Sequence, residues 1–165
     1  MKLATLVRWA GIILLGIFVL MQFVPYGRNH TNPPVRQEPA WDSPQTAALA
    51  RRACFDCHSN QTQWPWYSNI APVSWLVQND VDEGRRKLNF SEWDLPQKEA
   101  DEAAEQVQKG KMPPWFYLPL HAQARLSQPE KQALMGGLQT TLGRGKQHGE
   151  QSGEAVGEHE QEHEH

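Results

Sequence analysis

The sequence predicts an all-α domain with long irregular loops, preceded by an N-terminal transmembrane helix. Between residues 43 and 143, four segments carry helix caps or an apolar period of 3.6 residues, and no strand–helix–strand alternation separates them. Twelve prolines among 165 residues break the connections between these segments. An uninterrupted apolar run near the start of the chain predicts the membrane helix.

That apolar run lies in residues 1–24, which form either an uncleaved membrane anchor or a signal peptide. The part after Arg8 is short for a span, because about 20 residues are usual. Counting from Leu3, with Arg8 reaching the interface, restores the length. No small-x-small cleavage site follows Val24, so we favour the anchor.

Two polar segments flank the predicted domain at residues 43–143. Residues 25–42 are rich in Pro, Asn and Arg and are expected to form a flexible tether that holds the domain off the membrane. Residues 144–165 are rich in Gly, Glu, Gln and His and are expected to be a disordered, solubilising tail. Weak binding of a transition metal by the tail histidines is the alternative.

The motif Cys54-x-x-Cys57-His58 contains both cysteines of the chain. Two thiols at this spacing, followed by a histidine, are typical of c-type haem attachment. Each thiol can form a thioether with one vinyl group of the porphyrin, and the imidazole can then bind the iron as proximal ligand. The motif therefore predicts one covalently bound haem c.

A bare Cys-x-x-Cys also occurs in thioredoxin-like redox pairs, in zinc sites and in short disulfides. The redox pair is expected near a βαβ unit, which this sequence lacks. A zinc site needs a fourth ligand, and no second Cys-x-x-Cys supplies one. A disulfide across so short a loop would stabilise little. We favour haem attachment over these alternatives.

The first helix is predicted to begin at Ser43, an N-cap residue, followed by Pro44 at the first helical position. An alanine-rich stretch carries it towards Cys54, so the haem motif lies at its end.

Residues 59–72 lack a helical period and predict an irregular loop. Backbone carbonyls near Pro65 or Pro72 are candidate acceptors for the second ring N–H of His58. Three aromatic residues of this loop are expected to bind the haem by wrapping one of its faces or edges: Trp64, Trp66 and Tyr67.

A second helix is predicted from Pro72 to Gly84, where a glycine would end it. Its apolar face is formed by Val73, Leu76, Val77 and Val81. The basic cluster at residues 85–87 is interpreted as a solvated helix end, with a haem propionate contact or a partner docking patch as the alternative.

Two further helices complete the predicted domain. The third begins at Pro96 and ends at Gly110, with its apolar period at Ala100, Ala103, Ala104 and Val107. The fourth begins with a capping box formed by Ser127 and Glu130 and ends near Gly143. Its apolar stripe consists of Leu134, Leu138 and Leu142.

The second axial ligand of the iron is expected to be Met112. Class I cytochromes c place a methionine on the far side of the haem, downstream of the attachment motif, and thioether ligation raises the potential. Met112 follows the third helix in a loop stiffened by two prolines. His121 is the main alternative, an open site is another, and Met135 lies on a less suitable face of the fourth helix. A closed iron site transfers electrons, whereas an open one binds small ligands.

Residues 45–142 resemble a bacterial haem-binding domain family that is related to cytochrome c. The resemblance lies in the stretches CFDCHSNQTQWPWYSNIAPVSWLV, GRRKLNFSEW, KGKMPPWFYLPLH and RLSQPEK. It implies a cytochrome c-like helical domain with covalent haem, in which Cys54 and Cys57 attach the haem and His58 binds its iron. The biological reaction of this family is poorly defined, so the resemblance does not specify one.

The sequence therefore predicts a membrane-tethered electron carrier rather than an enzyme. A haem-based sensor or an accessory subunit of a larger redox complex is the alternative, and a peroxidase-like enzyme is a weaker one because no distal His/Arg pair is identified. Since c-type haem is attached outside the bacterial cytoplasm, the domain is expected on the periplasmic face of the inner membrane. The expected partners are the membrane, the haem-attachment machinery and an unidentified redox protein. A net charge of −3 gives no indication of nucleic-acid binding.

Overall fold

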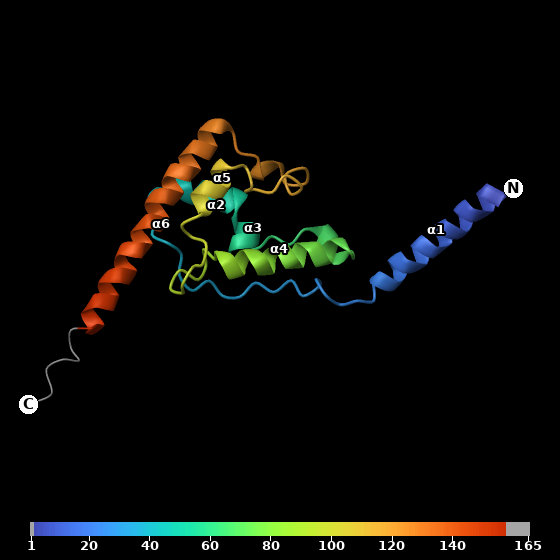
Figure 1. Cartoon of the computed structure of the whole chain (residues 1–165), viewed down its shortest axis with the longest axis horizontal. Helices are drawn as coiled ribbons and strands as arrows, with labels where there is room; N and C mark the ends of the chain where they lie inside the picture. Colours follow the sequence, from blue (N-terminus) through green and yellow to red (C-terminus); the bar gives the residue numbers. More distant parts are fainter. Residues whose placement is uncertain (1, 158–165) are drawn as a thin grey trace, which may run out of the picture.

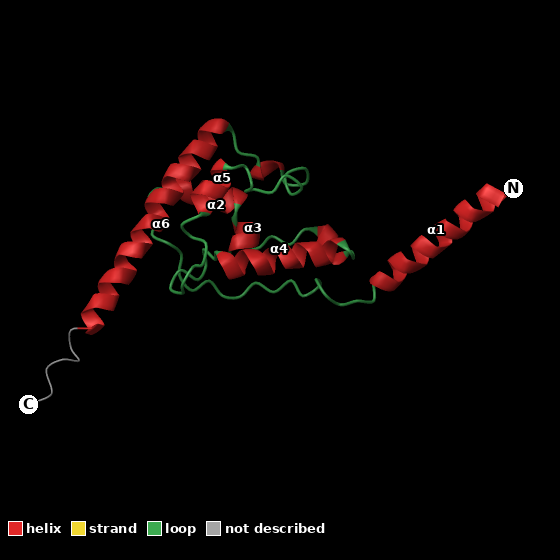
Figure 2. Cartoon of the chain, viewed as in Figure 1, coloured by secondary structure: helices red, strands yellow, loops and turns green. Residues whose placement is uncertain are grey.

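The chain folds into helices joined by long loops (Figures 1 and 2). A computed structural model describes the backbone of residues 2–157 and the side chains of residues 2–143. No strand occurs in this part of the chain, which confirms the predicted all-α class. The α-helices are α1 (Lys2–Met21), α2 (Pro44–Ala53), α3 (Phe55–His58), α4 (Val73–Lys87), α5 (Ala103–Gln108) and α6 (Gln128–Gly157), and the 3₁₀ turns are η1 (Trp66–Asn69) and η2 (Ala122–Ala124).

Helix α1 projects away from the rest of the molecule (Figure 1). It has 20 residues with a hydropathy of 2.2, and none of its side chains is buried. By length and composition it can cross a membrane, as the sequence predicts.

The segment after α1 is extended but bound to the domain, which differs from the expected flexible tether. The Arg36 N–H donates to the Ser91 carbonyl at 2.8 Å, and the Trp93 N–H donates to the Gln37 carbonyl at 2.9 Å. Earlier in the same segment, the Asn32 side chain donates to the Thr62 carbonyl at 2.9 Å. Backbone groups of this proline-rich stretch thus find partners in the domain, which fixes its course.

The core lies where α6 packs across α2 and α5. Leu134, Leu138 and Leu142 are buried on α6, as the predicted apolar stripe requires, and they meet Leu49 of α2 and Val107 of α5. The aromatic side chains of the core are Trp41, Phe55, Phe90 and Trp93, whose rings contact one another in series. This core supports the loop and helix that carry the cysteine motif.

Helix α4 begins as predicted but does not end at Gly84, because it continues to Lys87. Gly84 keeps a helical φ, so it is not a left-handed cap. A Cβ at Gly84 would lie 2.8 Å from the carbonyl carbon of Cys57 and closer still to its oxygen. The glycine is required by this close approach of α4 to the cysteine motif, not by a helix end. The predicted apolar face is also only partly buried, since Val81 is buried whereas Val73 and Leu76 are exposed.

Helix α5 is shorter than predicted and begins at Ala103 rather than at Pro96. The Gln97 side chain accepts from the Asn89 N–H and donates to the carbonyls of Glu92 and Leu95, which holds the intervening chain in turns. The predicted end is confirmed, because Gly110 has a φ of +66°.

Helix α6 begins at the predicted capping box, in which the Ser127 N–H donates to Glu130 at 2.7 Å. The predicted end near Gly143 is wrong, because the helical backbone continues to Gly157. Gly143 has no positive φ and no neighbour that a side chain would meet, so nothing there stops the helix. Of the predicted tail, residues 144–157 are therefore helical in backbone. Residues 158–165 and the side chains of the tail histidines lie outside the described part.

Candidate functional site

The cysteine motif forms a short turn that joins α2 to α3. The Cys54 N–H donates to the Ala50 carbonyl at 2.8 Å, which closes α2. The Cys57 and His58 N–H groups donate to the Cys54 carbonyl at 3.2 Å and 2.9 Å. Because these two N–H groups share one carbonyl, the motif forms a single tight turn, and both thiols and the imidazole line the same cavity. The predicted place of the motif, at the end of the first domain helix, is confirmed.

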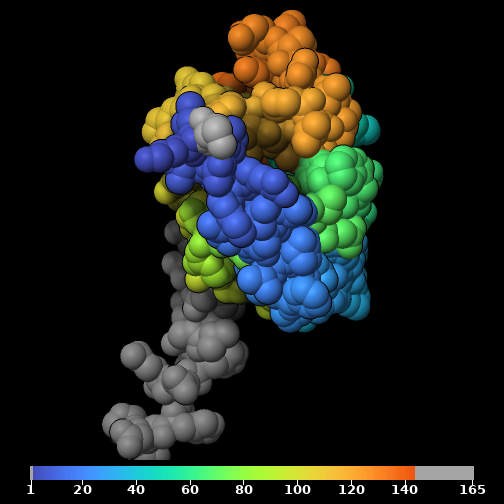
Figure 3. All heavy atoms as spheres, turned by 90° about the vertical axis from the view of Figure 1, so that its right-hand side faces the viewer, coloured from blue at the N-terminus to red at the C-terminus, as the bar shows by residue number. Residues whose placement is uncertain are grey.

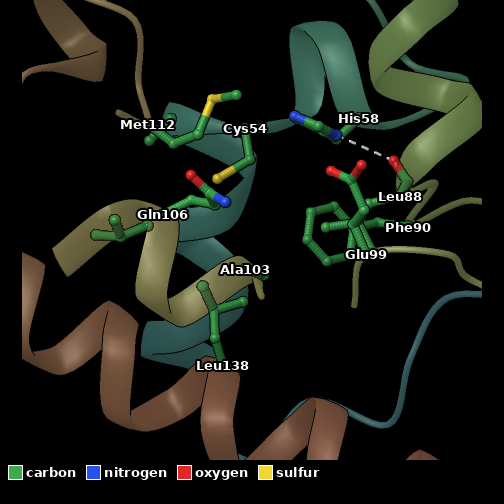
Figure 4. A pocket seen from close by; sticks show the side chains of 11 residues that line it. Cys54, His58, Leu88, Phe90, Glu99, Ala103, Gln106, Met112 and Leu138 are labelled. Carbon is green, nitrogen blue, oxygen red and sulfur yellow. Dashed lines mark hydrogen bonds between the residues drawn. The ribbon is translucent and has the colours of Figure 1, made fainter. Parts of the chain in front are cut away.

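These three side chains line a cavity of about 360 Å³ between the motif, α4 and the loop after α5. A smaller cavity of about 60 Å³ adjoins it above the core and is shown in Figure 4. Both cavities are lined by Ala53, Cys54, His58 and Met112. The four residues thus mark one continuous site with a deep, apolar end.

His58 is held by two backbone carbonyls. Its Nδ1 lies 3.1 Å from the carbonyl oxygens of Gly84 and Leu88. A carbonyl only accepts, so Nδ1 carries the proton. Burial lowers the pKa of His58, which favours the neutral ring. In that tautomer Nε2 has a free lone pair, and Figure 4 shows this nitrogen pointing away from Leu88, towards the gap that Met112 and Cys54 border.

The predicted acceptors for His58, carbonyls near Pro65 or Pro72, are wrong. The acceptors come from the last turn and the C-terminal cap of α4. The close approach allowed by Gly84 brings this end of α4 beside α3, so its terminal carbonyls reach the imidazole.

Both cysteines are partly buried, and neither thiol forms a disulfide. Burial raises the pKa of Cys54 to about 12 and that of Cys57 to about 12, so both remain protonated at neutral pH. Redox-active and metal-binding cysteines have lowered pKa values instead. The described residues also contain no group of three or more His, Cys, Asp or Glu side chains placed to hold a metal ion. The raised thiol pKa values therefore give no support to the redox-pair interpretation.

Met112 forms the wall of the site opposite His58 (Figure 4). It follows Gly110 in the loop after α5, where the Met112 N–H donates to the Gln106 carbonyl at 3.2 Å. Its side chain is 36% exposed. Met135 packs against the hydrophobic core and lines neither cavity.

His121 lies outside both cavities, and both of its ring nitrogens have partners. Its Nε2 is 3.2 Å from the Tyr67 hydroxyl, and its Nδ1 is 2.9 Å from the Tyr117 carbonyl. The ring also stacks on Tyr117 at a centroid distance of 3.7 Å. The imidazole is thus engaged within the protein.

The three aromatic residues expected around the haem do not line either cavity. Trp64 stacks on His30 at 4.6 Å, and Trp66 is 76% exposed. Tyr67 contacts His121 instead. The apolar side chains that do line the cavities come from later segments: Leu88, Phe90, Val107, Phe116, Tyr117 and Leu138. Two of them, Phe116 and Tyr117, lie in the aromatic run shortly after Met112, which was a signal visible in the sequence.

The three basic residues at the end of α4 make different contacts. Arg85 donates to the carbonyls of Ser59 and Thr31 and to the side chains of Asn32 and Thr62, so it fastens the segment after α1 to the loop after the motif. Arg86 pairs with Glu83 at the surface. Lys87 pairs with Glu99 at 3.1 Å and, like Lys111, lines the larger cavity.

Comparison with protein families matches residues 16–140 to a family described as a haem-binding domain. The matched range includes the cysteine motif, α4 and the Met112 loop. Neither the curated proteins nor the solved structures contain a match to the chain.

Proposed function

Because the chain belongs to the haem-binding domain family, we propose that it holds one haem c covalently and acts as a membrane-anchored electron-transfer protein. Cys54 and Cys57 would form the two thioethers, and His58 would be the proximal ligand. The observation that carries this proposal is the arrangement of His58. Its Nδ1 is bound to two carbonyls, so its Nε2 faces a cavity that both thiols and Met112 also line.

The residues of the site fit this group. A cavity of about 360 Å³ lies within the range of about 300–1,000 Å³ that is usual for ligand sites. Hydrogen bonds from Nδ1 to carbonyls orient a ligating imidazole and raise its basicity. Lys87 and Lys111 would offer cationic partners to the propionates. When bound, haem supplies one-electron transfer between ferric and ferrous iron.

Met112 is proposed as the second axial ligand. It is the methionine that lines both cavities, opposite His58, whereas the ring nitrogens of His121 have other partners. The hydrogen bonds of Gln106 to the chain before Met112, together with the following prolines, restrict the loop that carries the thioether. Thioether ligation favours ferrous iron, which suits an electron carrier.

The proposed location is the periplasmic face of a bacterial inner membrane, with α1 as a single span. The apolar length of α1 supports the span, and the need for haem-attachment machinery outside the cytoplasm supports the orientation. The electron donor and acceptor would be other redox proteins or membrane-bound carriers that reach the exposed part of the site.

The test is an absorption spectrum of the full chain, matured in a host with haem-attachment machinery. The oxidised parent should show the weak far-red band of sulfur-ligated ferric haem. Met112→Ala should lose that band, while the control variants Met135→Ala and His121→Leu should keep it. A parent with high-spin iron that binds carbon monoxide readily would favour the sensor or enzyme alternative instead.

A further inference from the structure

We propose that the face of the domain around the base of α1 rests on the lipid surface, which fixes the orientation of the domain on the membrane. This juxtamembrane face consists of Trp66, Leu76, Trp115, Phe116 and Leu120, from η1, α4 and the loop before η2. The inference rests on the proposed anchoring by α1 and goes beyond it. A domain lying on the lipid differs from one that moves freely on a tether.

The side chains of the juxtamembrane face are unusually exposed for their size. Trp115 is 80% exposed, Trp66 76%, Leu120 69%, Leu76 64% and Phe116 55%. Large apolar side chains gathered at a surface mark contact with another molecule or a membrane. Tryptophan is enriched where proteins meet the headgroup region, since its ring is apolar and its N–H is polar.

These side chains come from three segments, of which η1 packs against α4 and also contacts the loop before η2. The Trp66 ring meets Tyr67 edge-on at 5.8 Å. The Tyr67 hydroxyl lies 3.2 Å from Nε2 of His121, the residue next to Leu120. Figure 3 views the molecule from the side of α1, and these segments lie on the side that faces the viewer. The exposed residues therefore form one face.

The end of α1 is fastened to the same face. The Gln22 side chain donates to the Ala71 carbonyl at 2.9 Å and accepts from the Ala71 N–H at 3.1 Å. Gly27 has a φ of +78°, and a Cβ there would lie 2.6 Å from the carbonyl carbon of Ser74. These contacts join the point where α1 would leave the lipid to the start of α4, on which Leu76 lies (Figure 1). The face is thus continuous with the proposed membrane span.

The residues of the face belong to stretches of the chain that contain no acidic residue. No Asp or Glu occurs in residues 1–37, 57–79 or 106–129, although the chain has 19 acidic residues. The same segments contain Arg28, Lys109, Lys111 and Arg125. Asp56, which accepts from the Tyr117 hydroxyl, and Asp80, one turn after Leu76 on α4, lie beside the face, but its five residues carry no charge that anionic headgroups would repel. A lipid surface fits this combination of aromatic, aliphatic and basic residues better than a second, acidic copy of the chain.

The experiment places the photocrosslinker p-benzoylphenylalanine at Leu76 or Leu120 of the full chain, one position at a time. The control position is Leu95, an exposed leucine outside the face. Each variant is reconstituted into vesicles of phosphatidylcholine and phosphatidylglycerol and illuminated. Intact-mass spectrometry then measures the fraction of protein that carries a lipid adduct. Only variants with the thermal transition of the parent are compared. If the crosslinker at Leu76 or Leu120 prevents folding, it is placed at Trp115, another residue of the face.

The expected result is a yield of lipid adducts at least several-fold higher at Leu76 and Leu120 than at Leu95. Equal yields at all positions would overturn the inference. Chain-to-chain adducts at the face would also overturn it, because a second copy would then cover the face. The lipid adduct does not depend on axial ligation, so the spectrum of the same preparation reports separately whether the proposed electron-transfer function fails.

Discussion

Gly84→Ala tests the close contact on which the geometry of His58 depends. The added Cβ would lie 2.8 Å from the carbonyl carbon of Cys57 and 3.0 Å from its Cβ. Alanine gains about 1 kcal/mol of helix propensity over glycine. Overpacking costs about 1–3 kcal/mol, and here the upper value applies because the neighbour is backbone that cannot rotate away.

Separation of α4 from α3 also weakens the hydrogen bond from His58 Nδ1 to the Gly84 carbonyl. A bond of this kind contributes about 1 kcal/mol. We therefore expect Gly84→Ala to lower the free energy of unfolding by about 2–3 kcal/mol, from overpacking and the lost bond less the gain in propensity. Equilibrium urea unfolding of the full chain in detergent, followed by tryptophan fluorescence, measures this difference.

Gly136→Ala is the matched control, because Gly136 lies in α6 with nothing near its missing Cβ. There the same change should stabilise the protein by about 0.5–1 kcal/mol. If both variants are at least as stable as the parent, α4 does not pack against the cysteine motif as described, and the reasoning on His58 fails.

Three further predictions follow from contacts around the site. Arg85→Lys keeps the charge but loses the hydrogen bonds of the guanidinium to Ser59, Thr31, Asn32 and Thr62, so it should lower the free energy of unfolding by about 1–3 kcal/mol and speed proteolysis of residues 28–36. The control Arg86→Lys, at the surface, should change neither the free energy of unfolding nor the proteolysis rate. The Ser127 N–H and Arg52 lower the pKa of Glu130 from 4.5 to about 2, so the ionised carboxylate stabilises the fold above pH 4.5 and this contribution is lost as the pH falls towards 2. Glu130→Gln should remove this part of the acid dependence of thermal unfolding, and a pH profile equal to that of the parent would contradict the prediction. His121→Leu removes the bonds to Tyr67 and Tyr117 and should lower the melting temperature without altering axial ligation, which a change of the visible spectrum would disprove.

Local signals in the sequence were sufficient for several elements. Ser43 accepts from the Thr46 N–H at 3.1 Å, and Ser127 and Glu130 form the expected capping box. These interactions join residues three apart, so the sequence displays them directly. Met112 lines the same cavities as Cys54 and His58, but its predicted role as the second axial ligand stays a prediction.

Features that depend on tertiary contacts were not predictable in this way. Gly84 has the sequence signature of a helix end, but its role is to admit the Cys57 backbone. The aromatic loop residues Trp64 and Trp66 lie outside the cavity, because that loop packs against the segment after α1 and leaves its outer face exposed. A residue type indicates a preference for apolar or polar surroundings, but it does not specify which surface supplies them.

The most direct test of the account is the intact mass of the denatured chain after maturation in a host with haem-attachment machinery. The account predicts the mass of the polypeptide plus one haem, and no retained haem in Cys54→Ser/Cys57→Ser. A bare polypeptide mass, with haem absent or released on denaturation, would contradict covalent attachment and the function proposed from it.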